Sequence, residues 1–279
     1  MVANLSISSN VMPLYIPSQA GDLFALFYPS ATGSHKKVVI HIPAFAEEMN
    51  KSRRMVALQA RMFSDQGYGV LILDLLGTGD SSGDFSDATW LIWQQNIQTA
   101  MDWLLQQGIE SISLWGLRIG ALLAMDFIAK TRTNVDKLIC WQPVTNGEMF
   151  VMQFLRLRVA AAVMDRNAPQ EKTSDLKQQL VEGKAIEVAG YLLNPELVKP
   201  LLALKASALD LSSVKTIRLF EMVASEDKGV SSVNVNFIEE LIRKGQDAIA
   251  KAIVGTPFWS TQEIAEVPQL LTKTLASLS

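Results

Sequence analysis

An arginine flanked by glycines is the feature of this sequence that most clearly suggests a functional site. Arg118 is the centre of the run Gly116-Leu117-Arg118-Ile119-Gly120, between an expected strand and an expected helix. There it would lie at a helix N-terminus, where the macrodipole and free N–H groups favour anions. Its guanidinium adds a planar fork of five donors that suits carboxylate, phosphate or sulfate. We therefore predict a site for a small anionic or acyl-type ligand.

Three carboxylates could instead neutralise Arg118 inside the protein. Glu47 and Glu48 follow an expected strand, and Asp227 lies in a short polar segment after another. A buried guanidinium needs such a partner, because an unpaired charge is costly to bury. Glu47 and Glu48 also have two interpretations of their own, as a general base beside the site or as a solvated acidic pair before a helix. The sequence leaves these alternatives open.

Both histidines come early in the chain. His35 and His41 precede Arg118, and none follows it. His41 ends an expected strand, where it could donate a proton, contact a ligand, or serve as a structural histidine bonded to nearby backbone. The single cysteine, Cys140, is expected in the core, because nothing near it in sequence would lower the pKa of its thiol.

Neither a metal nor a cofactor is expected. Two histidines and one cysteine are too few for a zinc site. The glycines of residues 77–83 are spaced G-x-G-x-x-x-G and open no helix, unlike a dinucleotide fingerprint. Asp80, Asp84 and Asp87 could hold a hard cation in principle, but loop and helix-capping roles explain them.

Strands and helices alternate through the first half of the chain. An antiparallel hairpin is predicted over Met12–Ile16 and Leu23–Tyr28. Short apolar runs predict buried strands at Lys37–Ile42, Val70–Asp74, Ser111–Trp115 and Leu138–Trp141. Apolar residues at helical spacing predict helices at Ser52–Gln66, at Asp87–Gln107 with Asp87 as its cap, and at Ile119–Lys130. This alternation favours a mainly parallel sheet with helices on both faces.

The alternation is interrupted over residues 146–209, where the sequence predicts no strand. Helical segments are expected at Met149–Met164, at Ser174–Ala189, and from Asn194-Pro195 onward. Strands at Thr216–Ala224 and Ala250–Val254 and helices at Ser232–Arg243 and Pro268–Leu278 then follow. We expect a core in two parts, 1–145 and 210–279, and an inserted helical cap, 146–209. The apolar cap could roof a pocket or form a homodimer interface.

Composition narrows the class of protein. The 279 residues are 49 % hydrophobic and 19 % charged, which suits a large core and argues against disorder. A net charge of −3 argues against nucleic-acid binding. No apolar stretch approaches the ~20 residues of a spanning helix, and no signal peptide is visible. We therefore expect a cytoplasmic protein without a transmembrane segment.

Three motifs resemble the α/β-hydrolase fold. The run 116–120 resembles the G-x-S-x-G nucleophile elbow, with arginine where serine belongs. Asp74-Leu-Leu-Gly77-Thr-Gly79-Asp-Ser81 resembles the D-x-x-G-x-G-x-S loop of many such hydrolases, in which Ser81 is a turn former. His41-Ile42-Pro43-Ala44-Phe45 resembles the H-G loop that supplies half of the oxyanion hole, without its usual glycine.

A narrower resemblance covers nearly the whole chain. The run His41–Ala57, the glycine-flanked arginine and Pro257-Phe258-Trp259 are similar to one small family, the exosortase A system-associated hydrolases of the second type. The resemblance implies a Gram-negative bacterium that makes an exopolysaccharide. It also implies hydrolysis of ester- or thioester-like bonds.

The resemblance implies a site in which the usual triad is incomplete. Such hydrolases use a serine at the elbow, an acid, and a histidine late in the chain. Here Arg118 takes the serine position, Asp227 the acid position, and Phe258 and Trp259 lie in the loop where the histidine belongs. An oxyanion-type pair could still come from the N–H of Ile119 and one from the Ala44–Phe45 loop.

Three hypotheses remain for the function. The chain could be a hydrolase that activates water with Glu47, Glu48 or Asp227 while Arg118 holds an anionic substrate. It could be a non-catalytic binding protein that keeps the fold, with Arg118 as an anion anchor. It could also be a structural partner that associates through its apolar cap.

Overall fold

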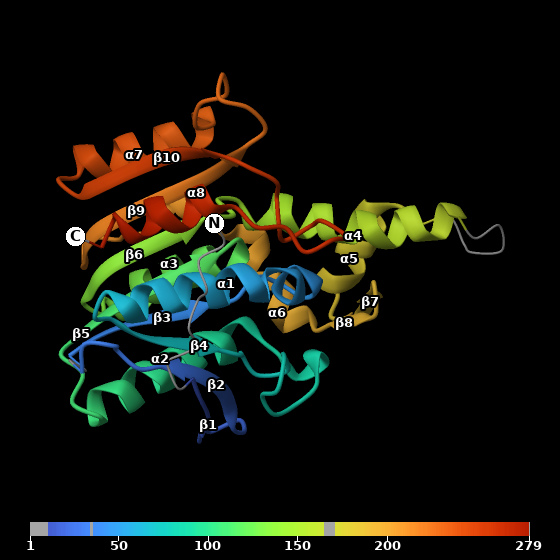
Figure 1. Ribbon diagram of the computed structural model, residues 1–279. Coiled ribbons are helices and arrows are strands. Elements are labelled where there is room, and N and C mark those ends of the chain that lie inside the picture. Colours follow the sequence, from blue (N-terminus) through green and yellow to red (C-terminus); the bar gives the residue numbers. More distant parts are fainter. Residues whose placement is uncertain (1–10, 34–35, 165–170, 279) are drawn as a thin grey trace.

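The architecture is built around one large sheet. The computed structural model describes residues 11–33, 36–164 and 171–278. Eight strands follow the order β1-β2-β4-β3-β5-β6-β9-β10 (Figure 1). They are β1 (Met12–Ile16), β2 (Leu23–Tyr28), β3 (Lys37–Ile42), β4 (Gly69–Leu73), β5 (Ser111–Leu117), β6 (Val135–Trp141), β9 (Val214–Val223) and β10 (Asp247–Val254).

The strand directions confirm the predicted hairpin and the mainly parallel sheet. β1 and β2 pair antiparallel, and β2 is antiparallel to β4. All other neighbouring strands pair in parallel. β4 is buried at every position, which explains its continuous apolar sequence, because a central strand between two helical layers has no solvent-facing side.

Helices cover both faces of the sheet. On one face, α1 (Glu47–Asp65) and α8 (Pro268–Leu275) pack on a core that includes Phe63, Trp115 and Trp141. On the other face lie α2 (Trp90–Gln106), α3 (Ile119–Thr131) and α7 (Ser232–Arg243). With these layers the chain has the α/β-hydrolase fold that the motifs indicate.

An insert between β6 and β9 extends to one side of the sheet (Figure 1). It contains α4 (Gly147–Met164), α5 (Thr173–Val181) and α6 (Pro195–Ala203), together with a hairpin of β7 (Ile186–Val188) and β8 (Tyr191–Leu193). Short 3-10 turns lie at η1 (Phe85–Asp87) and η2 (Ala206–Ala208). As predicted, α6 begins at Pro195 with Asn194 as its cap, whose side chain accepts from the Glu196 N–H.

The expectation that residues 146–209 contain no strand is wrong. The helix predicted over Ser174–Ala189 ends at Val181, and Gly183 follows with a φ of 90°. The chain then forms the β7–β8 hairpin, whose turn residues Ala189 and Gly190 have φ values of 50° and 84°. Two positive φ values in a two-residue turn match the twist of a hairpin, a pattern that an alanine-glycine pair signals weakly.

Two predicted helix starts are also wrong. α1 begins at Glu47, five residues before the predicted Ser52, so Glu47 and Glu48 form its first turn rather than preceding it. The cap of α2 is Thr89, whose hydroxyl accepts from the Ile92 N–H. Asp87 lies in η1, where its carboxylate accepts from the Asp84 N–H.

Many of the apolar residues of the chain form a large buried core. In the three ranges that the structure describes, no helix combines the length and the apolarity needed to cross a bilayer. Cys140 is fully buried, as predicted, and burial raises the pKa of its thiol far above the ordinary value. The thiol is therefore unreactive at neutral pH.

Candidate functional site

The turn between β5 and α3 presents Arg118 in a strained conformation. Arg118 has a φ of 55° and a ψ of −118°, which a non-glycine residue rarely adopts. The turn is so tight that a Cβ on Gly116 would lie 2.4 Å from the backbone of Ala121. A Cβ on Gly120 would lie 2.4 Å from the carbonyl oxygens of Ile42 and Pro43. Both glycines are therefore steric requirements of the turn.

Arg118 is paired with Glu48 of the first turn of α1. Its Nε lies 3.2 Å from Glu48 Oε1, and the two side chains are 18 % and 24 % exposed. Burial raises the pKa of the Glu48 carboxyl, although the neighbouring Arg118 opposes that rise. Glu48 Oε2 is buried without a hydrogen-bond partner. Only one of the two carboxylate oxygens of Glu48 therefore has a hydrogen-bond partner.

Trp259 packs on the other side of Arg118. The guanidinium carbon lies 5.4 Å from the centroid of the Trp259 ring, in a cation–π arrangement. Trp259 is held by Phe258, whose ring lies edge-on to it with centroids 5.1 Å apart. Among the described residues, Arg118 makes no hydrogen bond through either Nη. The open half of the fork remains available to a ligand.

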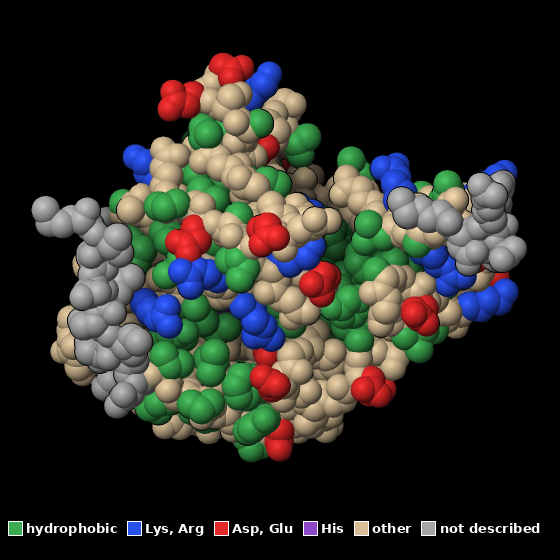
Figure 2. Space-filling model, turned by 45° about the vertical axis from the view of Figure 1, so that its right-hand side comes forward, with side chains coloured by type: hydrophobic (Ala, Val, Ile, Leu, Met, Phe, Trp, Pro, Cys, Tyr) green, Lys and Arg blue, Asp and Glu red, His purple; other side chains and the backbone are tan. Residues whose placement is uncertain are grey.

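A cleft of about 360 Å³ opens in front of Arg118, between the sheet edge and the insert. Its apolar lining is Phe45, Phe150, Phe154, Leu157, Ala189 and Trp259, and its polar lining is Glu47, Glu48, Lys51, Arg118, Gln153 and Ser260. Figure 2 shows hydrophobic side chains gathered where the insert joins the body of the molecule. The cleft therefore combines one charged end with a broad apolar wall.

Phe45 lies at the centre of a cluster of aromatic rings in the apolar wall of the cleft. Its ring contacts Phe150 and Phe154 of α4 edge-on, with centroids 5.4 Å and 5.0 Å away. Trp93 and Phe85 contact the same ring from α2 and η1. Edge-to-face contacts of this kind stabilise a fixed arrangement of rings. The loop after β3 and the insert are thus joined at the cleft.

Five of the ten residues singled out by sequence line this cleft. They are Phe45, Glu47, Glu48, Arg118 and Trp259. Glu47 accepts hydrogen bonds from Asn50 and from the Tyr191 hydroxyl of the insert.

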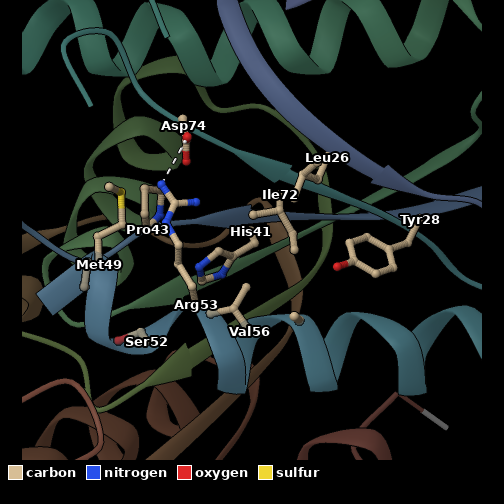
Figure 3. Close-up of a pocket in the computed structure, with 12 residues that line it drawn as sticks. Leu26, Tyr28, His41, Pro43, Met49, Ser52, Arg53, Val56, Ile72 and Asp74 are labelled. Atoms are coloured by element: carbon tan, nitrogen blue, oxygen red, sulfur yellow. Dashed lines mark hydrogen bonds and ion pairs between the residues drawn. The ribbon is translucent and has the colours of Figure 1, made fainter. Parts of the chain in front are cut away.

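The other five residues lie outside the cleft lining. Ile119 and Phe258 are fully buried beside it. Asp227 lies on the surface with its carboxylate bonded to Ser225 and near Lys228. His41 and Ala44 line a different cavity on the α1 face of the sheet (Figure 3).

Several cleft residues escaped the sequence analysis as site candidates. Lys51 lies one helical turn after Glu48, a spacing that could have placed it beside the acidic pair once the true start of α1 was known. Phe150 and Phe154 lie in the insert, which the sequence predicts only as an apolar helical cap. Their role depends on how α4 packs against Phe45, which no local pattern encodes.

Asp74, in the loop after β4, has its partners within the protein. No group of three or more His, Cys, Asp or Glu side chains there is placed to hold an ion. The loop after β4 instead satisfies its own polar groups: Asp74 accepts from the Asp80 N–H and pairs with Arg53. Ser81 donates to the Asp74 carbonyl oxygen, as a turn former does.

Comparisons with known proteins agree with this architecture. Residues 33–252 match the family of serine aminopeptidases, S33. The chain belongs to this family of α/β-hydrolase-fold proteins. A comparison with curated protein sequences finds no match.

Solved structures show the same fold. Est1E from Butyrivibrio proteoclasticus, with ferulic acid bound, has a TM-score of 0.71 at 16 % identity over 95 % of this chain and 97 % of its own. The α/β hydrolase GrgF from Penicillium sp. sh18 has a TM-score of 0.63 at 14 % identity, over 96 % and 97 %. Mouse α/β hydrolase domain-containing protein 10 has a TM-score of 0.59 at 13 % identity, over 97 % and 100 %. At these identities the likeness concerns the fold.

Proposed function

We propose that the chain is a non-catalytic binding protein of the hydrolase fold whose cleft takes a hydrophobic anion. The observation that carries this proposal is the state of Arg118. Its Nε is bound by Glu48, while its two Nη groups have no hydrogen-bond partner in the described residues and the side chain lines a cleft. A guanidinium with an open edge suits a carboxylate, sulfonate or phosphate.

Protonation of Glu48 is the step that lets this cleft take an anion at Arg118. The lining carries Arg118 and Lys51 together with Glu47 and Glu48, so its formal charges cancel until one carboxylate is protonated. Burial raises the pKa of the Glu48 carboxyl, so this group loses its negative charge more readily than an exposed glutamate. Once protonated, Glu48 stops competing for Arg118, and it gains an O–H that can donate to the incoming anion.

The apolar wall determines the size and polarity of the uncharged part of the ligand. Phe150, Phe154 and Leu157 of α4 line the cleft together with Trp259 and with Phe45, whose ring Phe150 and Phe154 contact. A volume of about 360 Å³ suits an aromatic or medium acyl chain rather than a bare inorganic ion. We therefore propose an aromatic or acyl acid as the ligand class.

The absence of a catalytic set in the cleft supports binding over hydrolysis. Among the described residues that line it, none is a histidine, cysteine or threonine. Ser260 is exposed, and its hydroxyl donates to the Pro257 carbonyl oxygen rather than to a base. A serine mechanism needs a base within hydrogen-bond reach of the nucleophile. We infer that the triad of the fold is degenerate here.

Calorimetric titration tests the proposal. We expect octanesulfonate and ferulate to bind the purified protein, while methyl octanoate, which lacks the charge, does not. Arg118→Met should weaken binding by at least about tenfold, because a charged hydrogen bond contributes ~1.5–3 kcal/mol. Arg156→Met on the exposed side of α4 is the control, since it removes the same charge outside the cleft. Equal losses in both variants, or equal binding of the neutral ester, would refute the anion site.

A second candidate function is hydrolysis through water activated by Glu48. The half-satisfied carboxylate with its raised pKa favours it, since a general base works best when its pKa approaches the working pH. Initial rates with p-nitrophenyl esters and acyl thioesters distinguish the two. Turnover above buffer that Glu48→Gln abolishes, in a variant that still binds octanesulfonate, would establish the enzyme.

The wider context is also a proposal. The resemblance of His41–Ala57 and Pro257-Phe258-Trp259 supports a place in a cytoplasmic exosortase and exopolysaccharide system. We propose that residues 146–209 act as a cap over the cleft. Exposed apolar residues on α4, Met149 and Leu157, also fit a homodimer interface, which sedimentation at rising protein concentration would detect.

A further inference from the structure

A second cavity lies on the other side of the first turns of α1. Its volume is about 140 Å³, and residues of β2, the end of β3, β4 and α1 line it without closing it off from solvent (Figure 3). None of its lining residues lines the Arg118 cleft. An apolar cavity of about 150 Å³ is large enough to hold benzene. The space therefore suits a molecule with a single ring.

His41 lines this cavity and has one ring nitrogen without a hydrogen-bond partner among the described residues. The side chain is 2 % exposed, and its Nδ1 lies 3.1 Å from the Trp115 carbonyl oxygen. A carbonyl can only accept, so Nδ1 carries the proton. Burial lowers the pKa of His41 to about 3, so the ring is neutral and Nε2 has a free lone pair. Nε2 has no hydrogen-bond partner within the described residues.

Tyr28 supplies a second unpaired polar group. The residue is 3 % exposed and lines the cavity, and Figure 3 shows its hydroxyl directed into the space toward the side where His41 lies. No described residue forms a hydrogen bond with this hydroxyl. Burial raises the pKa of Tyr28, so the group stays protonated and can both donate and accept. His41 Nε2 and the Tyr28 hydroxyl thus have no hydrogen-bond partner among the described residues, and both residues line one cavity.

The charges around the cavity cancel. Arg53 and Asp74 are the charged residues of its lining, and their Nη2 and Oδ2 atoms lie 3.3 Å apart. The remaining wall is mostly apolar and includes Leu26, Val56 and Ile72. A neutral cavity disfavours an ion, because a buried charge without a counter-charge is costly. A ligand for this space is therefore neutral, flat and able to donate one hydrogen bond.

We propose that this cavity is a second ligand site, which takes a neutral single-ring phenol. The phenol hydroxyl donates to His41 Nε2, and the Tyr28 hydroxyl donates to the phenol oxygen. The ring packs against Val56 and Ile72. This proposal is independent of the anion site at Arg118, because the two sites share no lining residue.

The two histidines of the chain give a direct test. In protein labelled with 15N only at histidine, the ring-nitrogen spectrum contains His35 and His41 alone. We expect phenol to shift the Nε2 signal of His41 in a saturable way and to leave His35 unchanged. Benzene, which lacks the donor, should bind more weakly and shift Nε2 less. An unchanged His41 spectrum at phenol concentrations up to ~10 mM, which corresponds to negligible affinity, would overturn the proposal.

Variants separate the cavity from other sites. Tyr28→Phe should weaken phenol binding by about 2- to 10-fold, the loss expected for one hydrogen bond. Tyr68→Phe is the matched control, because the Tyr68 hydroxyl donates elsewhere, to the Leu278 carbonyl oxygen. Ala57→Phe should fill the space and abolish the shift, with thermal unfolding confirming that the variant folds. If phenol still bound to a folded Ala57→Phe variant with unchanged affinity, the site would lie elsewhere.

Discussion

At the scale of single residues, Arg118 and Glu48 each form a hydrogen bond through only part of their charged group. Arg118 uses Nε alone, and Glu48 Oε2 is buried without a partner. A buried pair that is incompletely bonded contributes little to stability, because desolvation offsets the attraction. We propose that a bound ligand completes the hydrogen bonding of both groups. The strain at Arg118, whose φ is 55°, is also typical of functional positions.

The first prediction at this scale concerns pH. Burial raises the pKa of the Glu48 carboxyl against the opposing effect of Arg118. A raised folded-state pKa favours the folded protein below the unfolded pKa, and this contribution is lost as pH rises through the folded pKa. Anion binding follows the same direction, because protonated Glu48 releases Arg118. We expect octanesulfonate to bind more tightly as pH falls.

Calorimetry between about pH 4.5 and 8 measures this effect, since a sulfonate keeps its charge throughout while a glutamate titrates. Glu48→Gln should bind more tightly at neutral pH and lose most of the pH dependence. Glu47→Gln, which alters the neighbouring exposed carboxylate, serves as the control. A pH dependence that survives in Glu48→Gln would show that another group is responsible.

At the scale of elements, the site depends on close packing of α3 against the end of β3. Gly120 lies where a Cβ would approach two carbonyl oxygens of residues 42 and 43 within 2.4 Å. The same approach brings the loop with Phe45 beside Arg118. The first turn of α1 then supplies Glu48. The cleft therefore forms where the end of β3, the start of α3 and the first turn of α1 meet.

Gly120→Ala tests this packing. In an ordinary helix the change would stabilise the protein by ~0.5–1 kcal/mol. Here the added methyl must push backbones apart, so we expect a loss of about 2–3 kcal/mol in the free energy of unfolding. Gly229→Ala is the control, since its Cβ would meet nothing within 4 Å. Denaturant unfolding measures both, and equal stability of the two variants would contradict the packing argument.

At the scale of the whole molecule, the chain has the fold of its family, and we propose that its catalytic triad is degenerate. The chain belongs to the S33 family over residues 33–252, yet Arg118 occupies the turn between β5 and α3. No histidine follows residue 41 in the sequence, and His41 is buried on the α1 face of the sheet. A single reversion at the turn therefore cannot rebuild a triad whose base would come from a distant loop.

Arg118→Ser tests this statement. The variant restores a G-x-S-x-G sequence, but no histidine lies in the described lining of the cleft to activate the hydroxyl. We expect its rate with p-nitrophenyl butyrate to stay within about twofold of the Arg118→Ala rate, as expected when nucleophile and base do not act together. Labelling with a fluorophosphonate probe measures the nucleophile directly. Rapid labelling of Ser at position 118 would show that a base is present.

The sequence by itself determined the element types and most of the sheet. Apolar runs such as residues 37–42 and helical spacing such as residues 232–243 are local signals, and the structure has strands and helices there. The alternation of the two also predicted that most strands are parallel, because parallel neighbours need helical crossovers between them. The β7–β8 hairpin was missed because its turn, Ala189-Gly190, carries a weak local signal.

The site was decided by tertiary structure. Sequence singled out Arg118 and offered three carboxylates as partners, but the choice of Glu48 spans 70 residues and depends on how β3, β5 and α1 pack. His41 and Phe45 are four residues apart, yet they line different cavities on opposite sides of the first turns of α1. Local periodicity reports which face of an element is buried, whereas distances between side chains of separate elements arise only when those faces are packed together.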